Sequence, residues 1–198
     1  MNFFEKMYYD QGYERIAGVD EVGRGPLAGP VVAAAVILPK DGIGEKLFDS
    51  KKISSKKREE LYGLILSKAL GVGIGIIGQE EIDLLNILQA TLKAMALAVQ
   101  NLPMSPDFIL IDGPQSLRLP VSQKPIRKGD QLSNSIAAAS IVAKVTRDRM
   151  MLEWHRRYPQ YNFAKHKGYG TKEHRRAIEK FGVCELHRKT FGGVKEYL

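Results

Sequence analysis

Residues 16–30 of the chain are Ile-Ala-Gly-Val-Asp-Glu-Val-Gly-Arg-Gly-Pro-Leu-Ala-Gly-Pro. An apolar run ends at Asp20 and Glu21, and a connection rich in glycine and proline leads to a second apolar run over 31–38. This arrangement predicts two paired strands with a tight connection. Because side chains alternate along a strand, Asp20 and Glu21 should face opposite sides of the sheet unless the strand ends there. A strand end can direct both toward one point, as a divalent cation site requires.

The residues after the two carboxylates add groups suited to phosphate. Gly23 and Gly25 allow backbone amides to approach an anion closely, and Arg24 supplies a guanidinium. Carboxylates for a metal beside amides and an arginine for phosphate would form one coherent site. The alternative for the Asp-Glu dipeptide alone is a solvated pair at the mouth of a hairpin.

The bulk properties favour one globular domain with a polyanionic partner. The chain has 198 residues, 44% hydrophobic and 26% charged, with a net charge of +8 and a pI near 9.5. This charge favours nucleic acid or an anionic membrane surface. No apolar run reaches about 18 residues, the N-terminus lacks a signal-peptide pattern, and a single cysteine excludes an internal disulfide. We therefore expect a cytoplasmic protein that acts on nucleic acid.

The order of the predicted elements indicates an α/β domain. We predict strands over 16–22, 30–38, 72–77 and 106–111, an extended segment over 117–128, and helices from Ser54, over 80–102 and over 133–157. Short helices and loops follow, and residues 1–12 form a short helical lead-in. Three strands before the first long helix, followed by alternation, predict a mixed sheet.

Two further acids are candidates for the same site. Asp112 and Asp130 each follow an apolar or extended run, and each is adjacent to a glycine. Four acids around one point are costly unless cations neutralise them. Oxygen ligands without a cysteine and histidine set suit Mg²⁺ or Mn²⁺ rather than zinc. Spacing alone leaves open that Asp112 and Asp130 are ordinary turn residues.

Two other motifs are set aside. Residues 73–78 fit G-x-G-x-x-G, but apolar residues alternate within the motif, so it is itself a predicted strand, and residues 94–102 contain no acid. A dinucleotide site needs the motif after a strand and an acid about 20 residues on. Cys184 and His187 have the spacing of half a zinc site, but no second cysteine exists, so we expect a structural or surface role.

Six segments together resemble one known family, the type 2 ribonucleases H, and specifically bacterial ribonuclease HII. They occur in the family's order, and the resemblance covers roughly residues 16–191. The segments are DEVGRGPLAGP over 20–30, DSKK over 49–52, DGP over 112–114, KGD over 128–130, IAAASIVAKVTRDR over 136–149 and HKGYG over 166–170. The resemblance implies a ribonuclease H-like α/β fold, with a mixed sheet flanked by helices. We expect one catalytic domain over 1–198, with a core at about 14–158 and a C-terminal helical extension at about 159–198.

The resemblance also implies an activity. It predicts a metal-dependent endoribonuclease that hydrolyses the RNA strand of RNA/DNA hybrids and nicks duplex DNA on the 5′ side of embedded ribonucleotides. The expected products carry a 3′-hydroxyl and a 5′-phosphate, by a two-metal mechanism with Mg²⁺ or Mn²⁺. Because the signature begins at residue 16, the related type with a large N-terminal substrate-binding domain is disfavoured. We expect a monomer.

The family assigns roles residue by residue. Its catalytic and metal-binding acids match Asp20, Glu21, Asp112 and Asp130. Nucleic-acid binding falls on two groups. Gly23, Arg24 and Gly25 would recognise the 2′-hydroxyl, and Tyr169 the junction of RNA with DNA. Lys51 and Lys52 border the nucleic acid in the family and would contact phosphates, although a solvated helix approach is the alternative.

Two rival functions remain at this stage. One is another nuclease of the ribonuclease H-like fold, such as a junction resolvase, with the acids but no recognition of the 2′-hydroxyl. The other is a non-catalytic module that binds hybrids through its basic surface. Metal-dependent cleavage of a duplex with one ribonucleotide, but not of its all-DNA counterpart, separates the three.

Overall fold

The computed structural model describes residues 3–45, 47 and 53–198. The predicted phosphate contacts Lys51 and Lys52 lie outside the described residues. The strands are β1 (Ile16–Val22), β2 (Val31–Ile37), β3 (Gly71–Ile77), β4 (Phe108–Asp112) and β5 (Ser122–Ile126). The α-helices are α1 (Phe3–Tyr9), α2 (Ser55–Lys68), α3 (Gln79–Leu85), α4 (Ile87–Gln100), α5 (Asn134–Arg157), α6 (Phe163–His166) and α7 (Lys172–Phe181). Short 3₁₀ helices are η1 (Gly129–Gln131), η2 (Pro159–Tyr161) and η3 (Lys195–Tyr197).

The sheet is mixed, as the order of elements predicts. Its strand order is β3-β2-β1-β4-β5. β1 pairs antiparallel with β2, which pairs antiparallel with β3, whereas β4 runs parallel to both β1 and β5. The predicted hairpin of residues 16–38 is therefore confirmed, and it supplies the central strands.

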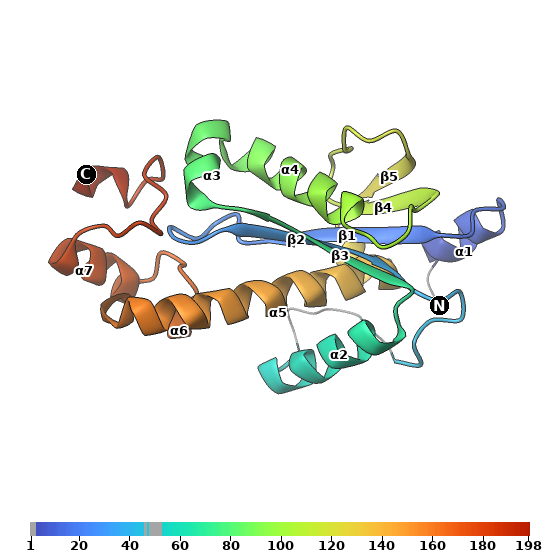
Figure 1. The fold of residues 1–198 in the computed structure, drawn as a ribbon, viewed down its shortest axis with the longest axis horizontal. Helices are drawn as coiled ribbons and strands as arrows, with labels where there is room; N and C mark the ends of the chain where they lie inside the picture. The colour runs from blue at the N-terminus through green and yellow to red at the C-terminus, as the bar shows by residue number, and fades with distance from the viewer. Residues whose placement is uncertain (1–2, 46, 48–52) are drawn as a thin grey trace.

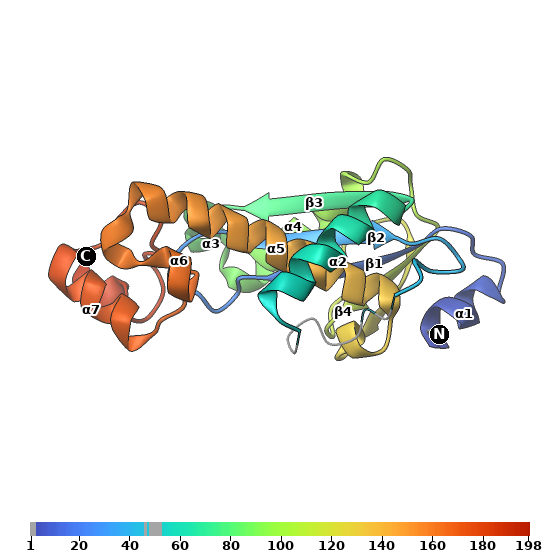
Figure 2. The ribbon, with the colours of Figure 1, turned by 90° about the horizontal axis from the view of Figure 1, so that it is seen from below.

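Helices cover both faces of the sheet (Figure 1). Alternate residues of β2 divide between two apolar clusters, because side chains of a strand point to opposite faces. Ala33 and Ala35 pack with α4, while Ala34 and Val36 pack with α5 and α2. Figure 2 shows α2 crossing α5 on the second face. Among the described helices, none is long and apolar enough to span a membrane.

Residues 73–77 of the G-x-G-x-x-G motif lie in β3, so the strand predicted over 72–77 is confirmed, and Gly78 follows the strand. Gly73 and Gly75 serve close packing against α4. A Cβ atom on Gly73 would lie 2.1 Å from the Ala98 carbonyl oxygen, and one on Gly75 would lie 2.0 Å from the Ala94 carbonyl oxygen. The helix backbone therefore rests directly on the strand, and any larger residue would displace it.

The helix predicted over 80–102 is wrong as a single element. The chain breaks at Asn86, whose φ is 69°, and α3 and α4 are separate helices. The Asn86 side chain accepts hydrogen bonds from the amides of Leu88 and Gln89, at 3.0 and 3.1 Å. Asparagine tolerates a left-handed φ and is a strong N-cap, so it can end one helix and begin the next. The apolar spacing continues across the break, which conceals it in the sequence.

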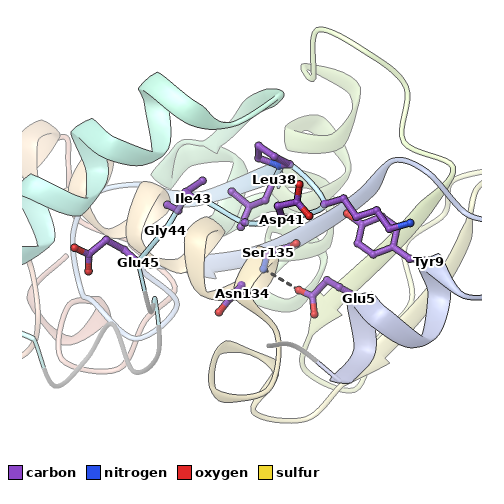
Figure 3. A pocket seen from close by; sticks show the side chains of 12 residues that line it. Glu5, Tyr9, Leu38, Asp41, Ile43, Gly44, Glu45, Asn134 and Ser135 are labelled. Carbon is purple, nitrogen blue, oxygen red and sulfur yellow. Dashed lines mark hydrogen bonds between the residues drawn. The ribbon is translucent and has the colours of Figure 1, made fainter.

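The N-terminal helix anchors the start of α5. Glu5 is 6% exposed, and its Oε1 accepts hydrogen bonds from Ser133 Oγ (2.6 Å) and from the Ser135 amide (2.9 Å). Figure 3 shows Glu5 beside a pocket of about 460 Å³ between α1, the segment after β2 and the start of α5. An acid at a helix N-terminus is favourable because it binds free amides. The described helix of the predicted lead-in, α1, is thus bonded to the start of the long helix through Glu5.

The segment after α5 packs against the β1–β2 connection. A single apolar cluster joins Leu27 and Ala28 of that connection to Met151 of α5 and to residues of η2, α6 and α7. The Leu27 amide donates to the Gly168 carbonyl at 2.8 Å, and the Arg188 amide donates to the Leu27 carbonyl at 2.8 Å. In Figure 1 the C-terminal helices lie at the end of the molecule opposite α1. The C-terminal segment therefore supports the Gly-Arg-Gly connection.

Candidate active site

Three of the four predicted acids form a cluster. Asp20, Glu21 and Asp112 each present one carboxylate oxygen, and these atoms lie within 4.8 Å of one another. Asp20 is 3% exposed, and the other two are half-buried. An all-oxygen set of three carboxylates suits a hard divalent cation. The donor set therefore fits Mg²⁺ or Mn²⁺.

Sheet geometry explains why the carboxylates converge. Asp20 pairs with Ala34, which packs against α5, whereas Glu21 pairs with Ala33, which packs against α4. The two side chains thus start from opposite faces, as alternation predicts. Pairing of β1 with β4 ends at Val19 and Ile111, while pairing with β2 continues to Val22. Both side chains therefore meet beyond this edge, next to Asp112.

The clustered carboxylates are crowded, and this alters their acidity. Burial raises the pKa of Asp20 well above its usual range, and the charges of Glu21 and Asp112 raise it further. A hydrogen bond from the Ser140 side chain partly offsets this. Burial also raises the pKa of Glu21, the nearby Arg24 charge lowers it, and Asp112 raises it. A bound cation would favour the ionised forms of all three acids.

Asp130 is not one of the three members of this cluster, although the residue before it contacts Asp112. It is 2% exposed in η1, directly after Gly129. The Gly129 amide donates to Asp112 Oδ1 at 2.6 Å, so the two segments are joined beside the cluster. The role of Asp130 as a fourth metal ligand stays a prediction.

A small recess lies beside the acids. It has a volume of about 80 Å³, and its lining includes Glu21, Arg24 and Asp112, with Leu88 and Thr91 from α4. The Arg24 side chain is half-exposed, and its Nη1 lies 3.4 Å from Glu21 Oε1. Arg24 therefore borders the acids while remaining accessible from solvent.

The remaining predicted recognition residues surround the same region. Gly23 has φ +98°, and a Cβ atom there would lie 2.4 Å from Arg147 Nε and 2.7 Å from the Pro30 carbonyl oxygen. A Cβ atom on Gly25 would meet only Tyr169, at 3.8 Å from Cε1. Tyr169 is 41% exposed. Gly25 and Tyr169 are therefore neighbours although 144 positions separate them in the chain.

Comparison with known proteins identifies the family of this chain. A family model described as ribonuclease HII matches residues 17–194. The chain belongs to the ribonuclease HII family. Ribonuclease HII of Syntrophus aciditrophicus (strain SB) is 58% identical over 191 residues, which cover 96% of this chain and 90% of that protein. Ribonuclease HII of Geobacter metallireducens is 57% identical over 195 residues, covering 98% and 92%.

Solved structures agree on the fold. Ribonuclease H2 from Pyrococcus horikoshii OT3 superposes with a TM-score of 0.79 at 23% identity, over 93% of this chain and 97% of that one. Bst-RNase HIII in complex with Mn²⁺ gives a TM-score of 0.70 at 17% identity, over 92% and 68%. The ribonuclease H-like α/β fold is thus confirmed. As a member of this family, the protein is a metal-dependent ribonuclease H that acts on RNA/DNA hybrids.

Sequence reasoning missed two buried arginines beside this candidate site. Arg147 and Arg188 are each fully buried and donate to backbone carbonyls. Arg147 donates to the carbonyls of Pro30 (2.9 Å), Lys167 (2.9 Å) and Ala28 (3.1 Å), so it ties the β1–β2 connection to the segment before Tyr169. Its position, seven residues after Ser140 on the small-residue face of α5, is a signal that could have revealed it.

The Tyr169 segment is held by a chain of neutral histidines. The Cys184 amide donates to His187 Nδ1 at 2.9 Å, so His187 must carry its proton on Nε2. His187 Nε2 lies 3.1 Å from His174 Nε2, and His174 Nδ1 lies 3.0 Å from the Tyr169 carbonyl oxygen. His187 Nε2 then donates to His174 Nε2, and His174 Nδ1 donates to the Tyr169 carbonyl oxygen. With this order of donors, every ring nitrogen in the chain has a hydrogen-bond partner. Of the two expected roles for the Cys184–His187 pair, structural or surface, these contacts favour the structural one.

Burial and the fixed donor order oppose protonation of these rings. Burial lowers the pKa of both His174 and His187 to about 4. The unfolded chain takes up these protons near pH 6.5, so between pH 6.5 and 4 the unfolded state binds more protons than the folded state. Stability from these groups is therefore present above pH 6.5 and is lost as the pH falls toward 4.

We predict a specific pH dependence of unfolding from this pair. The free energy of unfolding, measured with urea from pH 7 to pH 4.5, should fall more steeply for the wild type than for His174→Gln/His187→Gln. The slopes should differ by up to about 1.4 kcal/mol per pH unit for each histidine. Equal slopes would show that these rings are not held neutral.

Proposed function

We propose that the protein hydrolyses the RNA strand of RNA/DNA hybrids and nicks duplex DNA on the 5′ side of embedded ribonucleotides. The products would carry a 3′-hydroxyl and a 5′-phosphate. The observation that supports this is the placement of the Asp20, Glu21 and Asp112 cluster beside a glycine-rich connection and an accessible tyrosine. Such a site combines phosphodiester hydrolysis with recognition of one sugar. We further propose that residues 1–198 act as one monomeric catalytic domain in the cytoplasm.

The acids would hold two divalent cations, Mg²⁺ or Mn²⁺. Asp20, Glu21 and Asp112 would be ligands, and Asp130 would complete the set from η1. When bound, the ions would activate the attacking water and stabilise the leaving oxygen. The crowding that raises the pKa of Asp20 and Glu21 favours this assignment, because cations relieve it. Mn²⁺ in the related Bst-RNase HIII structure supports the choice of metal.

The chain itself would orient the substrate. Gly23, Arg24 and Gly25 would recognise the 2′-hydroxyl through their backbone, since this is the group that distinguishes RNA from DNA at one position. Tyr169 would stack on the neighbouring sugar, next to Gly25. Arg24 would bind a phosphate from its half-exposed position. Lys51 and Lys52 stay predicted phosphate contacts.

Cleavage of matched duplexes tests this function. One duplex carries a single ribonucleotide, and its counterpart carries the 2′-deoxy equivalent. We expect cleavage of the first in Mg²⁺ or Mn²⁺, at the 5′ side of the ribonucleotide, and none in EDTA. Products should be extendable by a polymerase at the 3′-hydroxyl. Equal cleavage of both duplexes would favour a nuclease that ignores the sugar, and binding without cleavage would favour a non-catalytic module.

A further inference from the structure

Arg188 makes an unusual set of contacts with the connection between β1 and β2. Its side chain is fully buried, and its guanidinium donates hydrogen bonds to backbone carbonyls of that connection. Nη2 donates to Gly23 at 2.5 Å and Nη1 donates to Arg24 at 2.9 Å. Nε and Nη2 donate to Gly29, at 3.0 and 2.9 Å. One planar guanidinium thus joins the two ends of the connection.

These contacts determine the direction of two peptide groups. The described chain has no cis peptide bond. In a planar trans peptide, the carbonyl of one residue and the amide of the next point in opposite directions. With the carbonyls of Gly23 and Arg24 directed at buried Arg188, the amides of Arg24 and Gly25 must point away from it. Two successive amides directed outward form a concave donor site for an oxygen.

The surroundings place this donor site where a substrate sugar would lie. Arg24 is beside Glu21 of the acidic cluster, and Gly25 is beside the exposed ring of Tyr169. The positive φ of Gly23 brings the chain into this turn, while the guanidinium of Arg188 fixes its orientation. Lysine could not reproduce the arrangement, because an ammonium cannot span three carbonyls as a planar fork does.

We propose that Arg188 is a positioning residue for ribonucleotide selectivity, since it turns the amides of Arg24 and Gly25 toward the 2′-hydroxyl of the substrate. The inference rests on the proposed function. It assigns a selectivity role to a residue that does not touch the substrate and lies 159 to 165 positions from the residues it contacts in the connection.

Binding measurements on Arg188→Lys test the proposal. Affinity is measured in Ca²⁺ for the single-ribonucleotide duplex and for its all-DNA counterpart. We expect the ratio of the two affinities to fall about tenfold, through weaker binding of the ribonucleotide duplex, with all-DNA binding unchanged. Arg188→Met, which removes every donor, should lower the ratio at least as far. Because both affinities come from one preparation, a partly unfolded sample does not alter the ratio.

Two controls separate positioning from stability and charge. Ile178→Ala removes a fully buried side chain from the same C-terminal cluster without touching the carbonyls, so it should lower the melting temperature and leave the ratio intact. Arg176→Met removes one charge from an exposed position of α7 and should also leave the ratio intact. If the affinity ratio falls equally in Ile178→Ala and Arg188→Lys, Arg188 has only a structural role.

A measurement on the unaltered protein covers the case in which Arg188 variants do not fold. The ¹⁵N–¹H signals of Arg24 and Gly25 should shift more with the single-ribonucleotide duplex in Ca²⁺ than with the all-DNA duplex. Identical shifts would overturn the inference. If the wild type does not distinguish the two duplexes at all, the proposed function fails. If it does and Arg188→Lys and Arg188→Met retain the ratio, only the positioning role fails.

Discussion

Asp112→Asn should lower the rate of hybrid cleavage in saturating Mg²⁺ by about 10³-fold or more. The substitution keeps the size of the side chain but removes a charged ligand from the cluster with Asp20 and Glu21. Asparagine Oδ1 can still accept the hydrogen bond that the Gly129 amide donates to Asp112, so the adjacent η1 segment should stay in place. Binding of the hybrid in Ca²⁺ should therefore largely survive. Single-turnover cleavage and equilibrium binding measure the two effects separately.

The same variant should also be more stable than the wild type in EDTA. Asp112 raises the pKa of Asp20 and Glu21 through charge repulsion, so its neutralisation relieves the crowded site. Asp41→Asn, an exposed acid near α1, is the matched charge control and should change neither rate nor stability. Near wild-type cleavage by Asp112→Asn would remove Asp112 from the metal site.

The parts of the fold that follow from local patterns could be predicted from the sequence. Two apolar runs within 16–38 and the glycine and proline connection between them are sufficient for the central hairpin, and Ser54 and Ser133 mark two helix starts through their side-chain caps. Spacing alone leaves open that Asp112 is a turn residue, and the family resemblance places it with Asp20 and Glu21, where the structure has it. The break at Asn86 could not be predicted from the sequence, because the apolar spacing of α3 continues into α4.

The other features that could not be predicted depend on contacts between segments that are distant in the sequence. Arg188 follows no periodic pattern, and its partners lie 159 to 165 positions away. The histidine chain likewise depends on how α7 packs against the segment after it. Such residues are charged or polar in the sequence, where exposure is the normal expectation. Only the folded chain provides the carbonyls that make their burial favourable.

Tyr169→Ala should reduce kcat/KM for the single-ribonucleotide duplex about 5- to 150-fold, because stacking of a ring on a nucleotide contributes about 1–3 kcal/mol. The affinity for a long RNA/DNA hybrid should fall far less, because phosphate contacts dominate that affinity. The ring is 41% exposed beside Gly25, and the Arg147 guanidinium lies 5.9 Å from its centroid on the protein side. Tyr169→Phe keeps the ring and should retain most of the activity.

Gly25→Ala tests recognition of the same sugar, at the residue that faces Tyr169. A methyl group there meets only Tyr169 at 3.8 Å, an ordinary contact, so the free protein should fold normally. Gly23→Ala is a poorer probe, because its methyl group would collide with Arg147 and Pro30. If the backbone at Gly25 binds the 2′-hydroxyl closely, the added methyl group keeps the two apart. Gly25→Ala should therefore lower the ratio of cleavage rates for ribonucleotide and 2′-deoxy duplexes. Tyr197→Ala, at a tyrosine of similar exposure (43%) in the C-terminal segment, should leave that ratio intact. If Tyr169→Ala and Gly25→Ala also leave it intact, the sugar is recognised elsewhere on the protein.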